Sequence, residues 1–506
     1  MKTFEGAEGA ATTPDPRRWL ALCVIGLTQL MIVLDASIVN IALPHAQADL
    51  GMSSIDRQWV ITSYTLAFGG LLLLGGRIAD YQGRKRMLII GLLGFATASA
   101  LGGAAQNAGM LFAARGLQGA FGAVMAPAAL ALITTTFTEP HERAKAFGVF
   151  GAIAGGGAAI GLIIGGILTE YTSWRWCLYV NVPVAIIAAA AAVPLVHESR
   201  AQGDRRYDIL GAVLVTAGLA LLVYGFTEAG KPVLDANGRA VGTVGWTDPV
   251  TLVCLFSAAA LLVGFFVWER ITASPLLPLR VILDRNRGGS YLVFLLLGAG
   301  LLGMFLFLTY YFQVQLGYSP LKAGFAFLPF SLGIILSAGL ASQLLPRFGP
   351  KPLMLTGLSM GIVAMLYLTQ ITLTSSYLTH VLPSEIVMSM GLALVFIPTA
   401  STALIGVAPH DAGVASAVLN AGQQVGGSLG TGLLNSVFFT VSTAFAAAHA
   451  GSIKDPQELA NLASIHGYHV TFLISAGLFT VALIITAALI RARRTDLPAE
   501  QVVAVA

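Results

Sequence analysis

Long apolar stretches dominate this sequence. A helix of about 20 apolar residues is long enough to cross a hydrocarbon core about 30 Å thick, and fourteen stretches reach that length. Only 10% of the 506 residues are charged, whereas soluble proteins carry about 25%. The sequence therefore predicts an all-α integral membrane protein. The predicted spans are 19–44, 58–79, 87–105, 108–137, 145–168, 174–196, 209–226, 249–268, 290–312, 323–345, 352–371, 381–408, 412–444 and 468–490.

The distribution of basic residues predicts how the chain is oriented. With the N-terminus in the cytoplasm, 21 of the 28 Lys and Arg residues lie in inner segments or the span ends beside them, six lie in outer loops, and Arg115 lies within a span. Basic residues favour the cytoplasmic side, so both termini are expected in the cytoplasm. The protein itself is expected in the inner (plasma) membrane. The net charge of only +4 gives no support for nucleic-acid binding.

A weak internal repeat predicts the domain organisation. The same offset separates Gly83 from Gly349, in two basic loops, and Gly161 from Gly427, in the two most glycine-rich spans. Parallel repeats of this kind are common in transporters. They favour two six-helix halves separated by an inserted pair, a 6+2+6 arrangement. The predicted units are a tail (1–18), a first half (19–200), the inserted pair (201–285, with an outer loop at 229–247), a second half (286–490) and a tail (491–506).

Two outer loops carry local signals. Asn237 and Gly238 lie between short strand-like arms, which predicts a hairpin. Asp455, Pro456 and Glu458 are a helix cap, a first-turn proline and a capping-box residue, which predicts a short helix outside the membrane. A disordered loop is the alternative for both.

Two ionisable side chains lie deep in predicted spans. Charges are costly in lipid and usually functional, and the two are Asp35 in the first span and Arg115 in the fourth. Burial disfavours the charged form of a carboxyl group, whereas arginine stays protonated. Asp35 is therefore the predicted proton carrier, with Arg115 acting on a nearby acid or orienting substrate. The alternative is a fixed structural acid, hydrogen-bonded or paired with Arg115. Glu228 and Glu385, near outer span ends where water is expected to reach them, are secondary candidates.

Polar residues at helical spacing predict inward-facing stripes. Arg115, Gln118 and Gly119 share one face of the fourth span, and Asn420 and Gln424 lie one turn apart in the thirteenth. Such stripes indicate either a substrate-contacting wall or hydrogen bonds that join helices. The residues expected to contact substrate are Asn40, Trp59, Gln118, Tyr311, Gln313, Asn420 and Gln424.

Glycines and one basic loop are candidates for conformational roles. The fifth span carries glycines at every fourth position, which usually means tight packing and alternatively a sliding surface. The loop after the second span reads as a topogenic signal or as a charge latch in which Asp80 docks on a helix N-terminus. The residues concerned are Gly157, Gly161, Gly165 and Gly166 in the span, and Gly76, Asp80, Gly83, Arg84 and Lys85 in the loop.

Enzyme signatures are absent from the sequence. It contains no phosphate-binding P-loop, nucleophile elbow or HExxH motif. Cys23, Cys177 and Cys254 lie in apolar segments without metal-ligand spacing. We therefore expect a secondary transporter, with no cofactor and no metal.

These residues resemble the 14-helix drug:proton antiporters of the major facilitator superfamily, the EmrB/QacA-like multidrug resistance branch. The resemblance covers essentially the whole chain and implies the major facilitator fold. It also implies export of small amphipathic or cationic compounds by alternating access, in exchange for protons. Asp35 matches the first-helix motif, and Arg115 matches a fourth-helix motif linked in the family to proton coupling. The matching segments are 34–44, 76–85, 115–119, 174–183, 277–279 and 412–424.

One position departs from the family pattern. Leu162 stands where the antiporter signature of the fifth helix has Pro, so a milder kink is expected. This difference favours an atypical exporter or an altered cycle.

Two other functions remain open: a facilitator or proton symporter for a small nutrient or metabolite, and a membrane sensor or scaffold that transports nothing. The chain is expected to act as a monomer on a small-molecule substrate and protons in the lipid bilayer.

Overall fold

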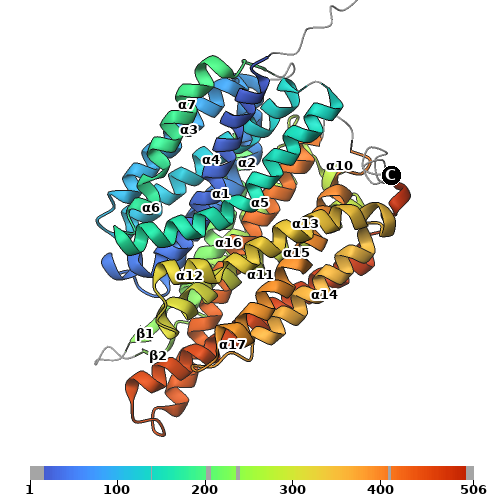
Figure 1. The fold of residues 1–506 in the computed structure, drawn as a ribbon. Coiled ribbons are helices and arrows are strands. Elements are labelled where there is room, and N and C mark those ends of the chain that lie inside the picture. The colour runs from blue at the N-terminus through green and yellow to red at the C-terminus, as the bar shows by residue number, and fades with distance from the viewer. Residues whose placement is uncertain (1–15, 138, 201–206, 235–239, 408–411, 497–506) are drawn as a thin grey trace, which may run out of the picture.

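The computed structural model describes residues 16–137, 139–200, 207–234, 240–407 and 412–496. These residues form a bundle of long helices (Figure 1). Thirteen described helices are long and apolar enough to cross a membrane. The fifth predicted span corresponds to α5 (Pro140–Tyr171), whose described apolar part, Gly156–Tyr171, is shorter than the others. The predicted all-α membrane architecture is confirmed.

The first half contains seven helices in chain order. Polar side chains start some of them: Asn107 accepts a hydrogen bond from the backbone N–H of Met110 (2.9 Å) and begins α4. A break at Val180 divides the sixth predicted span into two helices. Besides α5, the helices are α1 (Arg18–Asp49), α2 (Trp59–Gln82), α3 (Arg84–Gly103), α4 (Ala108–Thr136), α6 (Trp176–Tyr179) and α7 (Asn181–Leu195).

The inserted pair consists of α8 (Ile209–Ala229) and α9 (Pro249–Ile271). Strands β1 (Pro232–Leu234) and β2 (Ala240–Thr243) lie between them and pair antiparallel. The predicted hairpin is thereby confirmed, although its Asn237–Gly238 turn lies outside the described residues. The short helix α10 (Leu279–Ile282) leads into the second half. Figure 1 shows the hairpin at one end of the bundle, the predicted outer end, and α10 at the other.

The second half contains the two longest described helices and several interruptions. Two π-helical turns, η2 (Tyr311–Gln315) and η3 (Tyr377–Val381), lie at its predicted outer end. The tenth predicted span is divided at Phe327. The helices are α11 (Arg285–Tyr310), α12 (Pro320–Ala326), α13 (Leu328–Phe348), α14 (Pro350–Leu368), α15 (Leu382–Leu404), α16 (Ala412–His449) and α17 (Pro456–Leu489).

The last helix corrects one prediction. Asp455 accepts a hydrogen bond from the backbone N–H of Gln457 (2.9 Å) and starts α17, as the capping signal indicates. From Pro456 the helix continues without a break to Leu489. The separate short helix expected outside the membrane is therefore wrong, because its residues are the first turns of the final membrane helix.

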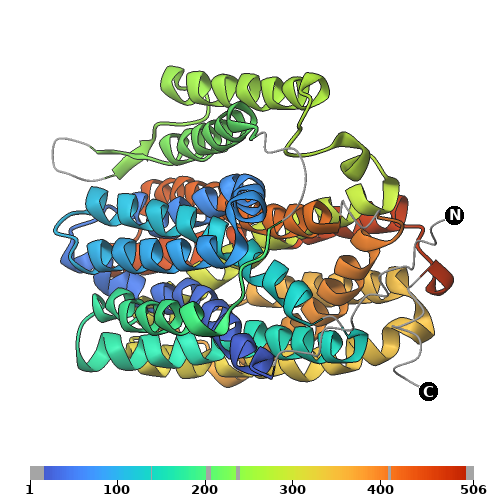
Figure 2. The same ribbon diagram turned by 90° about the horizontal axis from the view of Figure 1, so that it is seen from above.

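Two seams join the halves: α2 packs against α16, and α5 packs against α12 and α13. In the inserted pair, α8 contacts both α2 and α16. Figure 2 shows the pair, in green, as a layer on one face of the bundle, with α9 farther out than α8. The inserted pair therefore covers one of the two seams.

Polar contacts fasten the halves at the predicted outer end. The Gln313 amide donates to the carbonyl of Ile41 (3.0 Å), and the Tyr310 hydroxyl donates to Gln47 Oε1 (2.7 Å). The guanidinium of Arg57 lies 3.5 Å from the centre of the Tyr310 ring, a favourable cation–π contact. The described conformation is therefore held closed at this end. Three further hydrogen-bonded pairs join the halves: Thr65 with Ser428, Asn435 with Ile55, and Leu321 with Glu170.

Candidate functional site

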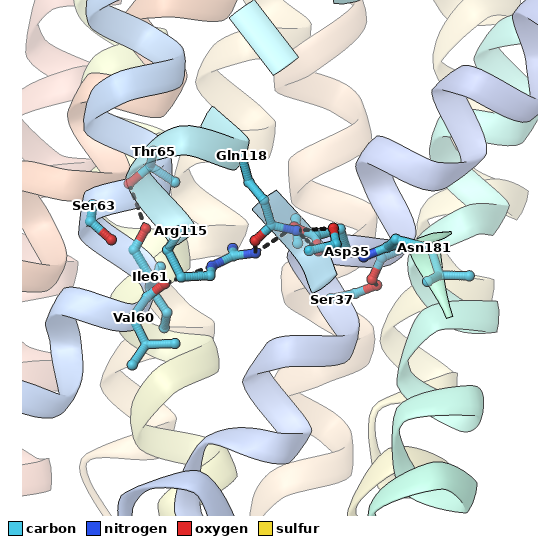
Figure 3. A network of polar contacts seen from close by, with 12 residues as sticks. Asp35, Ser37, Val60, Ile61, Ser63, Thr65, Arg115, Gln118 and Asn181 are labelled. Carbon is cyan, nitrogen blue, oxygen red and sulfur yellow. Dashed lines mark hydrogen bonds and ion pairs between the residues drawn. The ribbon is translucent and has the colours of Figure 1, made fainter. Parts of the chain in front are cut away.

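The carboxylate of Asp35 lies in the centre of the first half, with no exposed surface. Its Oδ2 accepts a hydrogen bond from Arg115 Nη1 (2.6 Å). Its Oδ1 accepts from Gln118 Nε2 (3.0 Å) and from Asn181 Nδ2 (2.8 Å). Figure 3 shows these side chains converging from three helices, α1, α4 and α7. Asp35 therefore faces polar groups of the bundle interior instead of lipid tails.

Arg115 has further partners besides Asp35. Its side chain is 2% exposed, its Nε donates to the carbonyl of Val60 (3.0 Å), and its Nη1 also donates to Gln118 Oε1 (2.8 Å). The guanidinium lies 4.4 Å from the centre of the Tyr64 ring. A buried ion pair needs partners for its remaining donors and acceptors, and this network supplies several of them.

Close packing against neighbouring helices holds the helices that carry Asp35 and Arg115. Gly119 on α4 lies against the backbone carbonyl of Tyr64 on α2, where a Cβ atom would clash with the oxygen. The glycines of α5 pack on α1: a Cβ at Gly165 would lie 3.0 Å from the Ile38 carbonyl oxygen. Small residues at such contacts let membrane helices approach closely. The glycine stripes therefore position Asp35 and Arg115.

A small cavity lies beside Arg115. Its volume is about 10 Å³, room for about one water molecule. Its lining comes from the predicted outer side of the network, including Ala46, Leu111 and Trp174. Apart from Arg115 this lining is mostly apolar, so the cavity offers few hydrogen-bond partners on the predicted outer side of the ion pair.

Of the residues predicted to contact substrate, only Gln118 joins the Asp35 network. The Asn40 amide donates to the carbonyl of Ala36 in its own helix (3.1 Å). The Tyr311 hydroxyl donates to the carbonyl of Thr372 (2.8 Å), inside the second half. Gln313 bridges the halves, as described above, and its Oε1 is buried without a partner. Trp59 packs on Tyr224 of the inserted pair, with ring centres 6.4 Å apart.

Asn420 and Gln424 lie on α16. The Asn420 side chain is exposed and donates to the carbonyl of Ser416 (3.1 Å). Gln424 is half-buried and lies against Gly69 of α2, where a Cβ would be 3.1 Å from the Gln424 Cβ. Gln424 therefore lies at the α2–α16 seam, whereas the Asn420 amide is bonded within its own helix.

The predicted residues of the basic loop form their contacts within the first half. Asp80 pairs with Arg84 (2.7 Å), and Gly83 has a φ of +117°, a conformation that favours glycine. Glu198 accepts hydrogen bonds from the backbone N–H groups of Lys85 (3.1 Å) and Arg86 (3.2 Å) at the start of α3. The acid on this helix N-terminus is therefore Glu198, while Asp80 pairs with a side chain. Gly76 lies in ordinary contact with Pro127.

The other predicted glycines separate into two groups. Gly157, Gly161 and Gly165 face α1, and Gly166 faces Leu321 of α12 in the second half. A Cβ at Gly166 would lie 2.6 Å from the Leu321 Cα atom. The ridge thus packs within the first half, and Gly166 packs across the seam. α5 continues without interruption past Leu162.

Sequence reasoning missed Asn181 and Ser99 as members of the Asp35 network. Asn181 donates to Asp35, and Ser99 Oγ accepts from Gln118 Nε2 (2.6 Å). Each is a buried polar residue in an apolar span, which is the available signal. Asn181 also stands in one of the motifs that carry the family resemblance.

The two secondary acids lie in different surroundings, and only Glu228 keeps the expected access to water. The side chain of Glu228 is 15% exposed and lies 3.3 Å from Lys231 Nζ. Glu385 is only 1% exposed, so the expectation that water reaches it is wrong in this conformation. The reason is that η3 extends α15 at its start, and Tyr377 of η3 lies against the carboxyl group.

Comparisons with known proteins agree with this architecture. A sequence profile of the Major Facilitator Superfamily matches residues 25–431. Puromycin resistance protein pur8 of Streptomyces alboniger is 48% identical over 96% of this chain and 93% of its own. Cephamycin export protein CmcT of Amycolatopsis lactamdurans is 37% identical over 86% of this chain and 88% of its own.

Two solved structures show the same fold at low identity. An auto inhibited POT family peptide transporter has a TM-score of 0.66 at 17% identity, covering 96% of this chain and 100% of its own. An inward-facing, unoccupied bacterial homolog of the human lysosomal transporter Spinster has a TM-score of 0.62 at 15% identity, covering 96% and 99%.

Proposed function

Because the chain belongs to the major facilitator superfamily, a multi-pass family of the membrane, we propose that it is a proton-coupled antiporter that exports small amphipathic or cationic compounds. The observation that carries this proposal is the sealed ion pair of Asp35 and Arg115 (2.6 Å) in the centre of the first half. Relatives named for puromycin resistance and cephamycin export support drug efflux as the direction and antibiotics as the substrate class.

The ion pair supplies the coupling. With Asp35 ionised, the two buried charges cancel. Protonation of Asp35 leaves the guanidinium of Arg115 buried without a counter-charge, which is costly in a medium of low polarity. The helices must then rearrange to hydrate or re-pair Arg115. Proton binding from outside therefore drives the conformational change, and release to the cytoplasm restores the pair. Each proton contributes about 2.3 kcal/mol per 100 mV of membrane potential.

The proposed transport cycle uses the two halves as rigid units. The first half (residues 19–200) and the second half (residues 286–490) rock about the substrate, and residues 201–285 form the inserted pair. A single copy of the chain carries out this cycle. The described conformation, fastened at the predicted outer end, is the one that receives substrate from the cytoplasm. Proposed substrate contacts are Asn40, Trp59, Tyr311, Gln313, Asn420 and Gln424, with Gln118 acting through the Asp35 network.

Inverted membrane vesicles with an acidic lumen test this function. We expect puromycin, as the probe, to accumulate inside against its gradient in exchange for protons. Asp35→Asn removes the titratable group and should abolish uphill accumulation while exchange of labelled for unlabelled compound continues. Asp49→Asn, on the same helix but paired with Arg175 (2.9 Å) at the outer end, is the matched control and should accumulate normally.

Two results would contradict the proposal. Uphill accumulation by Asp35→Asn in response to the proton gradient would show that Asp35 is not the carrier. Accumulation in whole cells that rises when the medium is acidified would show import by symport.

A further inference from the structure

Glu385 is a second buried carboxyl group, in the second half, and it differs from Asp35 in lacking a cation. It lies in the first turn of α15 and is 1% exposed. Its Oε2 lies 3.2 Å from the hydroxyl of Tyr377, and its Oε1 is buried without a hydrogen-bond partner. Among the described residues no basic side chain forms an ion pair with it. A carboxylate in such a site would be neither paired nor hydrated, which is costly.

Counting donors and acceptors around Tyr377 indicates which group carries the proton. A tyrosine hydroxyl has one hydrogen, and a backbone carbonyl can only accept. The Tyr377 oxygen lies 2.7 Å from the carbonyl oxygen of Ala326, so its hydrogen is used there. The 3.2 Å contact with Glu385 then requires a hydrogen from the carboxyl group. We propose that Glu385 is a proton-binding site, occupied while the outer end is closed.

Other titratable groups on the neighbouring elements have separate contacts. His380 Nδ1 lies 2.8 Å from Thr379 Oγ1, and Lys322 Nζ lies 3.8 Å from the centre of the Tyr318 ring. The Ser384 and Ser389 hydroxyls donate to carbonyls of their own segment. Tyrosine and histidine side chains on the surrounding elements complete the set: Tyr310 on α11, Tyr311 in η2, Tyr367 on α14 and His449 on α16.

The proton on Glu385 positions α12. The carbonyl of Ala326, at the C-terminal end of α12, has no later residue of that helix to bond with, and the Tyr377 hydroxyl satisfies it. α12 in turn presses on α5 of the first half: a Cβ at Gly324 would lie 2.5 Å from the Leu162 carbonyl oxygen. The chain of contacts from Glu385 through Tyr377 and Ala326 therefore ends at the α5–α12 seam.

Ionisation of Glu385 would break this chain. A charged acceptor forms a hydrogen bond roughly twice as strong as a neutral one, so the Tyr377 hydrogen would turn from Ala326 to the carboxylate. The carbonyl would lose its partner, and the carboxylate would require water. Both effects favour opening at the outer end. Glu385 therefore releases its proton to the outside when this end opens, and it must bind a proton again before this end closes.

This inference deepens the proposed transport cycle by adding an outside-facing proton site that controls closure. Its first test does not require transport: infrared difference spectroscopy of the purified full-length protein in lipid nanodiscs at pH 7. We expect the carbonyl band of a protonated carboxyl group, lost in Glu385→Gln and weakened in Tyr377→Phe, which leaves the outer end open. Glu228→Gln, an acid paired with Lys231, should leave the band unchanged. A band that Glu385→Gln does not alter would overturn the proposal.

A second test measures opening. Ser428→Cys, a buried position on the α2–α16 seam, is labelled from outside by a membrane-impermeant maleimide. The labelling rate, corrected for maleimide reactivity, should rise by up to about tenfold per pH unit, as expected for release of one proton. With Glu385→Gln added, the rate should be low and independent of pH; with Tyr377→Phe it should be high at every pH. An unchanged pH dependence in Glu385→Gln would contradict the proposal.

The vesicle assay separates this inference from the exporter proposal. Glu385→Gln keeps the Asp35–Arg115 pair, so proton-driven accumulation of puromycin should persist but lose its dependence on the pH at the outer face. If wild-type protein shows the infrared band and pH-dependent labelling but no proton-driven accumulation, the exporter proposal fails and the Glu385 site stands.

Discussion

The charge of Asp35 is stabilised by groups that come from distant parts of the chain. Arg115 and Gln118 follow Asp35 by 80 and 83 residues, and Asn181 follows it by 146 residues. Hydrogen bonds to a charged group each contribute about 1.5–3 kcal/mol. Because these donors stabilise the ionised form of Asp35, they set how readily a proton binds there.

Replacing Asn181 tests this at the scale of one residue. Asn181→Leu removes the donor at 2.8 Å from Asp35 Oδ1. The ionised form is then less favourable, so protons bind more tightly and release requires a higher cytoplasmic pH. Since one pH unit corresponds to about 1.36 kcal/mol, the pH profile of puromycin accumulation should move upward by about one unit.

The control is Thr28→Val, which alters a buried hydroxyl of α1 whose bond goes to its own helix, to Val24 (3.0 Å). It should leave the pH profile in place. A profile unchanged in Asn181→Leu would show that this amide does not influence the proton equilibrium.

The sequence predicts the two deep charges but not all of their partners. Asp35 and Arg115 are conspicuous because charged residues are rare in lipid. Asn181 and Ser99 are less so, since a single polar residue in a span is also compatible with a bond inside its own helix, as for Thr28. Which polar groups meet depends on helix rotation and packing, which residue spacing within one span does not determine.

At the scale of helices, the glycines of α5 determine how closely α1 approaches. Gly165 faces backbone atoms of Ile38, three residues from Asp35, and backbone cannot move aside as a flexible side chain does. Overpacking of this kind costs about 1–3 kcal/mol.

Gly165→Ala should therefore lower the unfolding temperature of the purified protein by a few degrees and weaken proton-driven accumulation. Thermal unfolding followed by intrinsic fluorescence measures the first effect. Gly116→Ala on α4, where a Cβ would meet nothing within 4 Å, is the matched control. Equal stability of both variants and wild-type protein would show that the α1–α5 contact tolerates a methyl group.

The sequence predicts where the membrane helices lie but not where they are interrupted. Hydropathy identifies the membrane segments because lipid requires every backbone group to be bonded within its own helix. Hydropathy does not detect the break at Phe327, the turns η2 and η3, or the continuation of α17 beyond the apolar stretch. These features depend on hydrogen bonds and neighbouring helices, so polar residues such as those after Pro456 remain helical.

At the scale of the whole molecule, the two halves must separate at the outer end for transport to proceed. Thr65 and Ser428 lie in direct hydrogen-bonding contact across the α2–α16 seam. Thr65→Cys with Ser428→Cys, in a chain whose three native cysteines are replaced by serine, should form a disulfide on oxidation. The locked protein should lose puromycin accumulation, and a reducing agent should restore it.

A disulfide inside one half is the control. Thr169 Oγ1 lies 3.3 Å from Cys177 Sγ, both in the first half. Thr169→Cys with the native Cys177, and with serine at positions 23 and 254, should oxidise without affecting accumulation. Full transport by the oxidised Thr65→Cys, Ser428→Cys protein would contradict movement between the halves at this seam.

The position of the inserted pair affects where a substrate can enter from the membrane. Gln58 of the first half donates to Thr227 of α8 (2.6 Å), and Ser436 of α16 donates to the α8 carbonyl of Phe226. α8 therefore contacts both halves across the α2–α16 seam. A hydrophobic antibiotic diffusing within the membrane would therefore meet the inserted pair on that side. The seam that the pair leaves uncovered is the opposite one, where α5 packs on α12 and α13.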